Sequence, residues 1–253
     1  MSDLVLGIDV GTSGVRVAAV DQAAWLVAFA ASTMPAAHRD HDRITQDAAA
    51  CSRGLDDAMT RLASMVDLAR VGALAVDGTS GTLVAVDDRG NPVTAGSLYN
   101  DRADDASIAV VERAAPAHAA VRGAASPLAR AMRLLQAGGV AKILHQADWV
   151  AGQFSGRFDI SDESNSLKTG YDPVARAWRT GSRPSTSNLA GICRRWFRPA
   201  PSSARCLPRR RTDLAYRPGL SLSPARRMDA RLSLRPAPAS RETPSPRWAR
   251  RWF

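Results

Sequence analysis

The sequence predicts a mixed α/β domain in residues 1–180 and no folded core in residues 181–253. Residues 4–21 form two apolar, β-branched runs around a Gly-Thr-Ser-Gly turn, a pattern that favours a β-hairpin. Residues 71–87 repeat the order of strand, Asp, Gly-Thr-Ser-Gly turn and strand. Between them, residues 46–65 carry Leu and Met near helical spacing. Strands that alternate with a helix in this way indicate the α/β class.

Local signals predict the other elements. Residues 24–30 supply a third strand after a short turn, so the first three strands form a meander. Thr45 is the expected N-cap of the helix over 46–65, which we expect to pack on the meander. Two further helices are predicted, over 126–136 and 143–154, because apolar residues recur there at helical spacing. Ser126 is the expected cap of the first of these helices, and Pro127 belongs to its first turn.

Charge divides the chain near residue 180. The whole sequence has a formal net charge of +10, but residues 181–253 hold 17 Arg, no Lys and 3 acidic residues, a net charge of +14. Residues 1–180 therefore have a net charge of −4. This balance is typical of an ordinary, slightly acidic soluble domain, and a basic surface that binds nucleic acid is not expected there.

Cysteine usage and hydropathy favour the cytoplasm. Cys51, Cys193 and Cys206 match no zinc or redox spacing, as expected in a reducing compartment. The longest apolar run covers the nine residues 23–31, whereas a membrane span needs roughly 18. No signal-peptide pattern is found at the start of the sequence. We therefore expect a cytoplasmic protein without a membrane partner.

The first Gly-Thr-Ser-Gly turn, residues Gly11, Thr12, Ser13 and Gly14, is a candidate phosphate site. Small residues leave several backbone N–H groups and two hydroxyls accessible, which is what a nest for an anion requires. Asp9 ends the preceding strand and is placed to hold Mg²⁺, usually through water. A plain glycine-rich hairpin is the alternative.

Polar residues also gather after the second turn. Asp77 and Ser80 belong to that turn, and Asn100, Asp101 and Arg102 follow the next strand. Such side chains are candidates for hydrogen bonds to a polyhydroxylated ligand, and a solvated loop is the alternative. Residues 38–43 contain two His and two Asp that could bind a metal ion. A charged turn before a helix is the simpler interpretation.

Four motifs together resemble the N-terminal domain of the FGGY carbohydrate kinases. The opening hairpin is similar to the first phosphate loop of the actin, Hsp70 and sugar-kinase superfamily, which has a ribonuclease-H-like fold. Within that superfamily, the stretches Asp-Gly-Thr-Ser-Gly-Thr and Leu-Tyr-Asn-Asp-Arg-Ala are most similar to D-ribulose kinases and xylulose-kinase-like pentulose kinases. The resemblance covers residues 4 to about 178, with motifs at 77–82, 98–103, 145–150 and 165–173. An actin- or Hsp70-like ATPase would share only the hairpin.

The resemblance implies ATP-dependent phosphorylation of a pentulose, with ATP and Mg²⁺ as cofactors and a small sugar as partner. Asp9 would organise Mg²⁺ and the transferred phosphate and touch the sugar, while Gly11 to Gly14 cradle phosphate. Ser80 would hydrogen-bond the pentulose. Asp77, Asn100, Asp101 and Arg102 would line the sugar pocket or support it.

The catalytic base of that family is an Asp in a Gly-Thr-Thr-Asp-like stretch, and no such stretch is found. Asp213 and Asp229 are the only Asp residues after position 180, and neither follows Gly-Thr. The family's second, ATP-binding domain has no counterpart in the sequence either. We therefore expect a truncated N-terminal half that does not turn over at a useful rate.

Residues 181–253 contain 10 of the 15 prolines and 10 serines, without an apolar period. This composition predicts disorder, because too little apolar surface is available to offset the entropy of ordering. Two interpretations stay open. The stretch is either the product of a frameshift near codon 180 or a genuine basic tail that binds nucleic acid or another anion. In the second case the chain would be a sugar-binding module derived from a kinase.

Overall fold

The computed structural model describes residues 3–172 and 174–175, together with the backbone of four later two-residue strands. The predictions for residues 181–253, a disordered or out-of-frame stretch or an anion-binding tail, fall outside the described residues except for the backbone of three of these strands. The four strands are β12 (Ala177–Trp178), β13 (Arg198–Pro199), β14 (Ala204–Arg205) and β15 (Ser221–Leu222).

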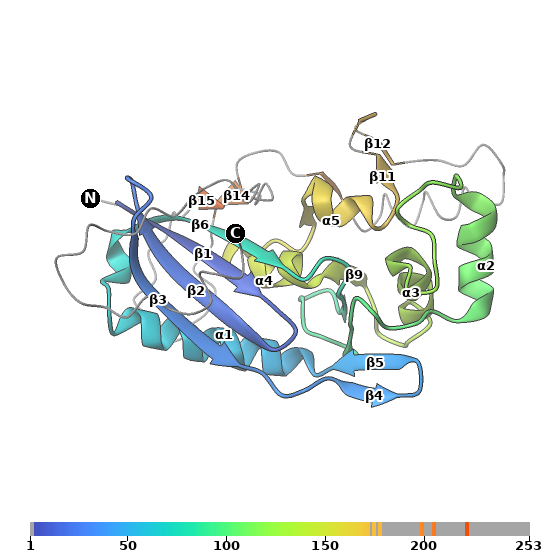
Figure 1. Cartoon of the computed structure of the whole chain (residues 1–253), viewed down its shortest axis with the longest axis horizontal. Helices are drawn as coiled ribbons and strands as arrows, with labels where there is room; N and C mark the ends of the chain where they lie inside the picture. The colour runs from blue at the N-terminus through green and yellow to red at the C-terminus, as the bar shows by residue number, and fades with distance from the viewer. Residues whose placement is uncertain are drawn as a thin grey trace.

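The first sheet contains the predicted meander. β1, β2 and β3 pair antiparallel, and β6 pairs parallel with β1 on its other side (Figure 1). The sheet order is β14-β15-β6-β1-β2-β3, with β15 parallel to β6. The hairpin and the third strand are confirmed, although the third strand starts later because Ala24 lies in the turn with a φ of 62°. The bounds are β1 (Leu4–Val10), β2 (Gly14–Asp21), β3 (Leu26–Thr33) and β6 (Val71–Gly78).

The helix α1 (Ala48–Ala63) lies along the sheet of β1, β2 and β3, as predicted (Figure 1). Its buried residues Leu55, Met59 and Leu62 belong to the same apolar core as the inward-facing residues of the strands. The predicted N-cap was wrong. Asp47 caps the helix by accepting a hydrogen bond from Ala49 N (2.9 Å), because Thr45 belongs to strand β5. A short 3₁₀ helix, η1 (Leu68–Arg70), leads into β6.

A second sheet forms from the segment between β3 and α1 together with segments that follow β6, in the order β4-β5-β8-β7-β9. The chain passes from β6 in the first sheet to β7 in the second, so the repeated strand-turn-strand pattern does not form a second hairpin. The β4–β5 hairpin projects at the lower right of Figure 1. The bounds are β4 (His38–Asp40), β5 (Arg43–Gln46), β7 (Leu83–Val86), β8 (Gly96–Ser97) and β9 (Lys142–His145).

Two helices contact the second sheet, and a third packs against one of them. α2 (Asp105–Ala114) precedes α3 (Pro127–Leu134), whose N-cap is Ser126 as the sequence suggests. The helix predicted over 143–154 begins later, as α4 (Gln146–Ser155), because residues 142–145 pair with β7 and form β9. Among the described helices, none is long and apolar enough to cross a membrane. β10 (Ile160–Ser161), α5 (Glu163–Leu167) and β11 (Tyr171–Asp172) follow α4 in the chain.

Candidate functional site

The parallel pairing of β1 with β6 brings the two Gly-Thr-Ser-Gly turns together. Asp9 pairs in register with Asp77 at the ends of the two strands. Just beyond, Thr79 N donates a hydrogen bond to Val10 O (3.1 Å). A Cβ atom at Gly78 would lie 2.9 Å from Val10 O, so glycine permits this approach of the two backbones. The candidate phosphate turn and the candidate sugar turn therefore share one end of the sheet.

The first turn uses its carbonyl groups to attach to the body of the domain. Gly11 N donates to Gly14 O (3.0 Å) and closes the turn. Thr12 O accepts from Gln46 Nε2 (2.9 Å), and Ser13 O accepts from Met34 N (2.9 Å). Among the residues that the structure describes, no acceptor is found for the N–H groups of Thr12 and Ser13. An anion could therefore accept hydrogen bonds from these amides.

Arg16 is a candidate site residue that the sequence analysis missed. It pairs across the strands with Asp9, and Arg16 Nη1 lies 2.9 Å from Asp9 Oδ2, with both side chains about half exposed. A Cβ atom at Gly11 would lie 3.1 Å from the same Nη1, so the guanidinium group lies beside the turn. The period of two along β2 placed Arg16 opposite Asp9, and that signal was available in the sequence.

The second turn lies beside the segment that follows β8. Gly81 has a φ of +91°, and a Cβ atom there would lie 3.8 Å from Tyr99 Cβ. Ser80 precedes Gly81 and is partly exposed, and Tyr99 is about half exposed. Asn100 Oδ1 is buried and has no hydrogen-bond partner among the described residues. The structure thus brings Ser80 near the Tyr99–Asn100 pair, as a site for a hydroxylated ligand would require.

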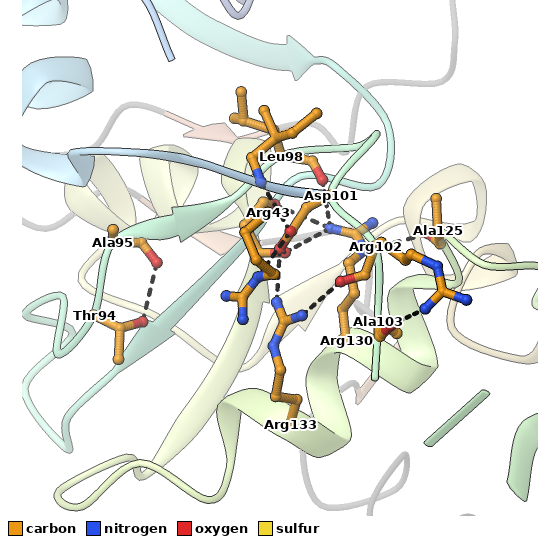
Figure 2. Close-up of polar contacts among 12 residues, drawn as sticks. Arg43, Thr94, Ala95, Leu98, Asp101, Arg102, Ala103, Ala125, Arg130 and Arg133 are labelled. Carbon is orange, nitrogen blue, oxygen red and sulfur yellow. Dashed lines mark hydrogen bonds and ion pairs between the residues drawn. The ribbon is translucent and has the colours of Figure 1, made fainter. Parts of the chain in front are cut away.

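Asp101 lies in the interior of the domain (Figure 2). Its Oδ1 accepts from Arg43 Nε (3.1 Å) and Ile44 N (3.0 Å), and its Oδ2 accepts from Ser97 Oγ (2.6 Å) and Arg133 Nη2 (2.6 Å). Burial acts to raise the pKa of Asp101, but these hydrogen bonds outweigh it and the pKa is lowered. With both oxygens engaged, the geometry favours support of a pocket over direct contact with sugar.

Arg102 faces the start of α2. Its Nη1 donates to Asp105 Oδ1 (2.7 Å), and its Nε lies 3.8 Å from Asp42 Oδ2. The side chain is about 40% exposed. These ion pairs join the β4–β5 hairpin to α2, so a supporting role is favoured for Arg102 as well.

Two further carboxyl groups lie beyond the second turn. Burial, and then the nearby Asp162 carboxylate, raise the pKa of Asp148 well above its usual value, although Ser161 and Asn165 act to lower it. Asp162 caps α5 by accepting from Asn165 N (2.8 Å). Its pKa is raised by burial and, to a smaller extent, by Asp77. Carboxyl groups therefore cluster on the Asp77 side of the site, and their raised pKa values favour the neutral forms of Asp148 and Asp162.

The metal alternative for residues 38–43 gains no support. His41 Nε2 lies 3.9 Å from Asp40 Oδ1, and both side chains are largely exposed. In the described part of the chain, no group of three or more His, Cys, Asp or Glu side chains could hold a metal ion. The segment forms most of the β4–β5 hairpin, in place of the plain charged turn before a helix that the sequence favoured.

Solved structures of carbohydrate kinases share this fold. Xylulose kinase from Rhodospirillum rubrum superposes with a TM-score of 0.71 and 18% identity, covering 87% of this chain and 48% of that chain. Xylulose kinase from Bifidobacterium adolescentis gives 0.65 and 19%, covering 88% and 53%. Plasmodium falciparum glycerol kinase with ADP gives 0.68 and 13%, covering 87% and 47%. The chain has the fold of the N-terminal half of the FGGY kinases.

The match to the N-terminal half of these kinases confirms the predicted α/β fold class. No family model matches the sequence. The chain spans about half the length of the kinases that it matches. At sequence identities of 20% or less, these superpositions show the fold alone. The substrate and the activity are therefore matters for proposal.

Proposed function

We propose that this chain is the sugar-binding domain of an FGGY-type pentulose kinase. One observation carries the proposal: the β1–β6 register places Asp9 beside Asp77 and the two Gly-Thr-Ser-Gly turns at the same end of the sheet. A phosphate donor at the first turn and a hydroxylated acceptor at the second would then be neighbours, which is the main requirement for phosphoryl transfer.

Each turn offers groups suited to one of the two ligands. The N–H groups of Thr12 and Ser13, together with the guanidinium of Arg16, would bind phosphate oxygens. Ser80, Asn100 and Asp77 would hydrogen-bond the hydroxyl groups of a ketopentose of the D-ribulose or D-xylulose class. Asp101 and Arg102 would hold the segment that carries Asn100.

Asp9 fits a magnesium-dependent site. Its side chain is about half exposed, and the ion pair with Arg16 engages Oδ2 and leaves Oδ1 for a hydrated ion. Mg²⁺ usually keeps several waters and is held by one or two carboxylates together with substrate phosphates. When bound with ATP, the ion would neutralise charge on the phosphates.

Turnover is a separate question from binding. The proton of the attacking hydroxyl needs an acceptor, and we assign no described residue to that role. Because general-base catalysis contributes about 10²- to 10⁴-fold, we expect the 253 residues alone to bind sugar and phosphorylate it slowly. A coupled assay with ATP, Mg²⁺ and D-ribulose or D-xylulose measures this rate, and ordinary kinase turnover would contradict the expectation.

Calorimetric titration with D-ribulose and D-xylulose tests the binding proposal directly. Ser80→Ala removes a hydroxyl that would bond the sugar, so affinity should fall about 5- to 100-fold. Ser64→Ala is the matched control, because Ser64 ends α1 and bonds only locally, to Arg61 O. Unchanged affinity in Ser80→Ala, or no heat with either ketopentose, would contradict the proposal.

A further inference from the structure

Arg130 on α3 joins the two segments that form the candidate sugar site. It is fully buried, and its Nη2 donates to Gly81 O in the second turn (2.6 Å). Its Nη1 donates to Leu98 O (2.7 Å) and Ser97 O (3.1 Å) at the start of the Tyr99–Asn100 segment (Figure 2). One guanidinium group therefore contacts both sides of the site from behind.

The other contacts of Arg130 fix the guanidinium in place. Nε donates to Ala125 O (3.2 Å), and Nη1 also donates to Ser97 Oγ (2.9 Å). The same hydroxyl donates to Asp101 Oδ2 (2.6 Å), which links Arg130 to the buried carboxylate. Burial lowers the pKa of Arg130 to about 10, so the side chain stays charged at neutral pH.

A buried charge of this kind is expensive unless every donor has a partner. The planar fork of arginine supplies five donors in fixed directions, whereas a lysine ammonium is a single point on a flexible stem. Only an arginine can therefore reach the Gly81 and Leu98 carbonyls at once in this geometry. Its bonds go to backbone oxygens of both segments, and such bonds set the position of the main chain directly.

We propose that Arg130 is a positioning residue for the sugar site, and that it holds the second turn and the Tyr99–Asn100 segment at the separation that the sugar requires. This inference rests on the proposed function, because the sugar is the ligand whose affinity it would set. It goes further in assigning the geometry of that site to a side chain that has no surface exposed to any ligand.

Arg122 provides a matched comparison. It also donates to two backbone oxygens, Glu112 O (2.6 Å) and Ala115 O (2.7 Å), and it pairs with the Glu112 carboxylate. These bonds join α2 to the loop that follows it and reach neither of the two sugar-site segments. Replacing Arg122 therefore removes a similar set of bonds without touching the site.

The experiment compares Arg130→Met, Arg130→Lys and Arg122→Met in the full chain, with two readouts. Amide hydrogen exchange without sugar should accelerate in residues 79–82 and 97–101 of Arg130→Met, while α1 stays unchanged. Affinity for D-ribulose or D-xylulose should fall at least about tenfold in Arg130→Met. Arg130→Lys, which keeps the charge and some of the bonds, should be intermediate in both readouts, and Arg122→Met should match the wild-type chain.

Wild-type affinity in Arg130→Met, or exchange that accelerates equally in all elements, would overturn the proposal. If Arg130→Met does not fold, the same two comparisons on Arg130→Lys decide it. If the wild-type chain binds neither ketopentose, the proposed function fails. The exchange measurement then decides by itself whether Arg130 positions the two segments.

Discussion

The same four residues, Gly-Thr-Ser-Gly, occur at 11–14 and at 78–81, and the domain treats the two copies differently. The first copy closes a hairpin through the Gly11–Gly14 hydrogen bond and leads back into the same sheet. The second copy carries the chain out of the first sheet and into the second. It is attached to β1 through Thr79 and to α3 through Gly81.

The difference teaches that the surroundings of a turn decide which of its groups can meet a ligand. In the first copy the carbonyl groups of Thr12 and Ser13 bond to the body of the domain, so amide groups are left for an anion. In the second copy a buried arginine takes the Gly81 carbonyl, and an aromatic side chain and an amide side chain lie alongside. Identical residues thus offer donors in one place and a mixed polar surface in the other.

The largest effect on stability should come from Asp101, which supports the segment beside the second copy. Asp101→Ala removes the buried carboxylate that accepts from Arg133 and Ser97, and leaves a buried cation without its partner. The free energy of unfolding should fall by about 3–5 kcal/mol, measured by urea denaturation. Asp105→Ala removes an exposed carboxylate next to Arg102 and should change it by less than about 1 kcal/mol. Equal losses in the two variants would contradict this account.

Asp101 also gives a pH signature. Because its folded-state pKa is lowered, the ionised form stabilises the fold above the unfolded pKa, and this stabilisation is lost as pH falls through the folded pKa. Asp101→Asn has no such dependence. The difference in stability between the wild type and this variant should therefore narrow as the solution is acidified, and a constant difference would contradict the assignment.

An intermediate effect should come from the backbone packing of the first copy. A Cβ atom at Gly14 would lie 2.4 Å from Ser32 O on the neighbouring strand, so Gly14→Ala must displace backbone. We expect a loss of about 1–3 kcal/mol in the free energy of unfolding. Gly7→Ala is the control, since a Cβ there meets nothing within 4 Å, and its change should stay within about 0.5 kcal/mol. Similar thermal midpoints for the two variants would contradict the prediction.

The smallest effect on stability should come from the exposed ion pair of the first copy. Arg16→Met breaks the contact with Asp9, and exposed pairs contribute about 0–1 kcal/mol. Affinity for ATP with Mg²⁺, measured by calorimetry, should nevertheless fall, because a cation beside the amide groups is lost. Arg61→Met, which breaks a similar exposed pair with Asp57 on α1, should leave that affinity unchanged. If both variants bind ATP like the wild type, Arg16 has no role in the phosphate site.

Several helices and strands were predictable because they form from patterns of residues that are close together in the sequence. Alternation of apolar residues and the chemistry of small turn residues are local signals, and they located the opening hairpin, β6 and α1. The Ser126 cap of α3 was predictable for the same reason. The start of α4 was not, because residues 142–145 have an apolar pattern that suits either element and pair with β7 only in the folded domain.

By itself, then, the sequence located the strands of the opening meander, β6 and β7, and the helices α1, α3 and α4, but it missed β4, β5, β8, β9, α2 and α5. It also indicated two similar turns with polar residues near them. Only the tertiary structure decided what those residues touch. It enclosed Asp101 while leaving Tyr99 half exposed, and it placed Arg130 behind both sugar-site segments. These outcomes depend on contacts between segments far apart in the chain, and no local pattern of residues specifies which of those segments will pack together.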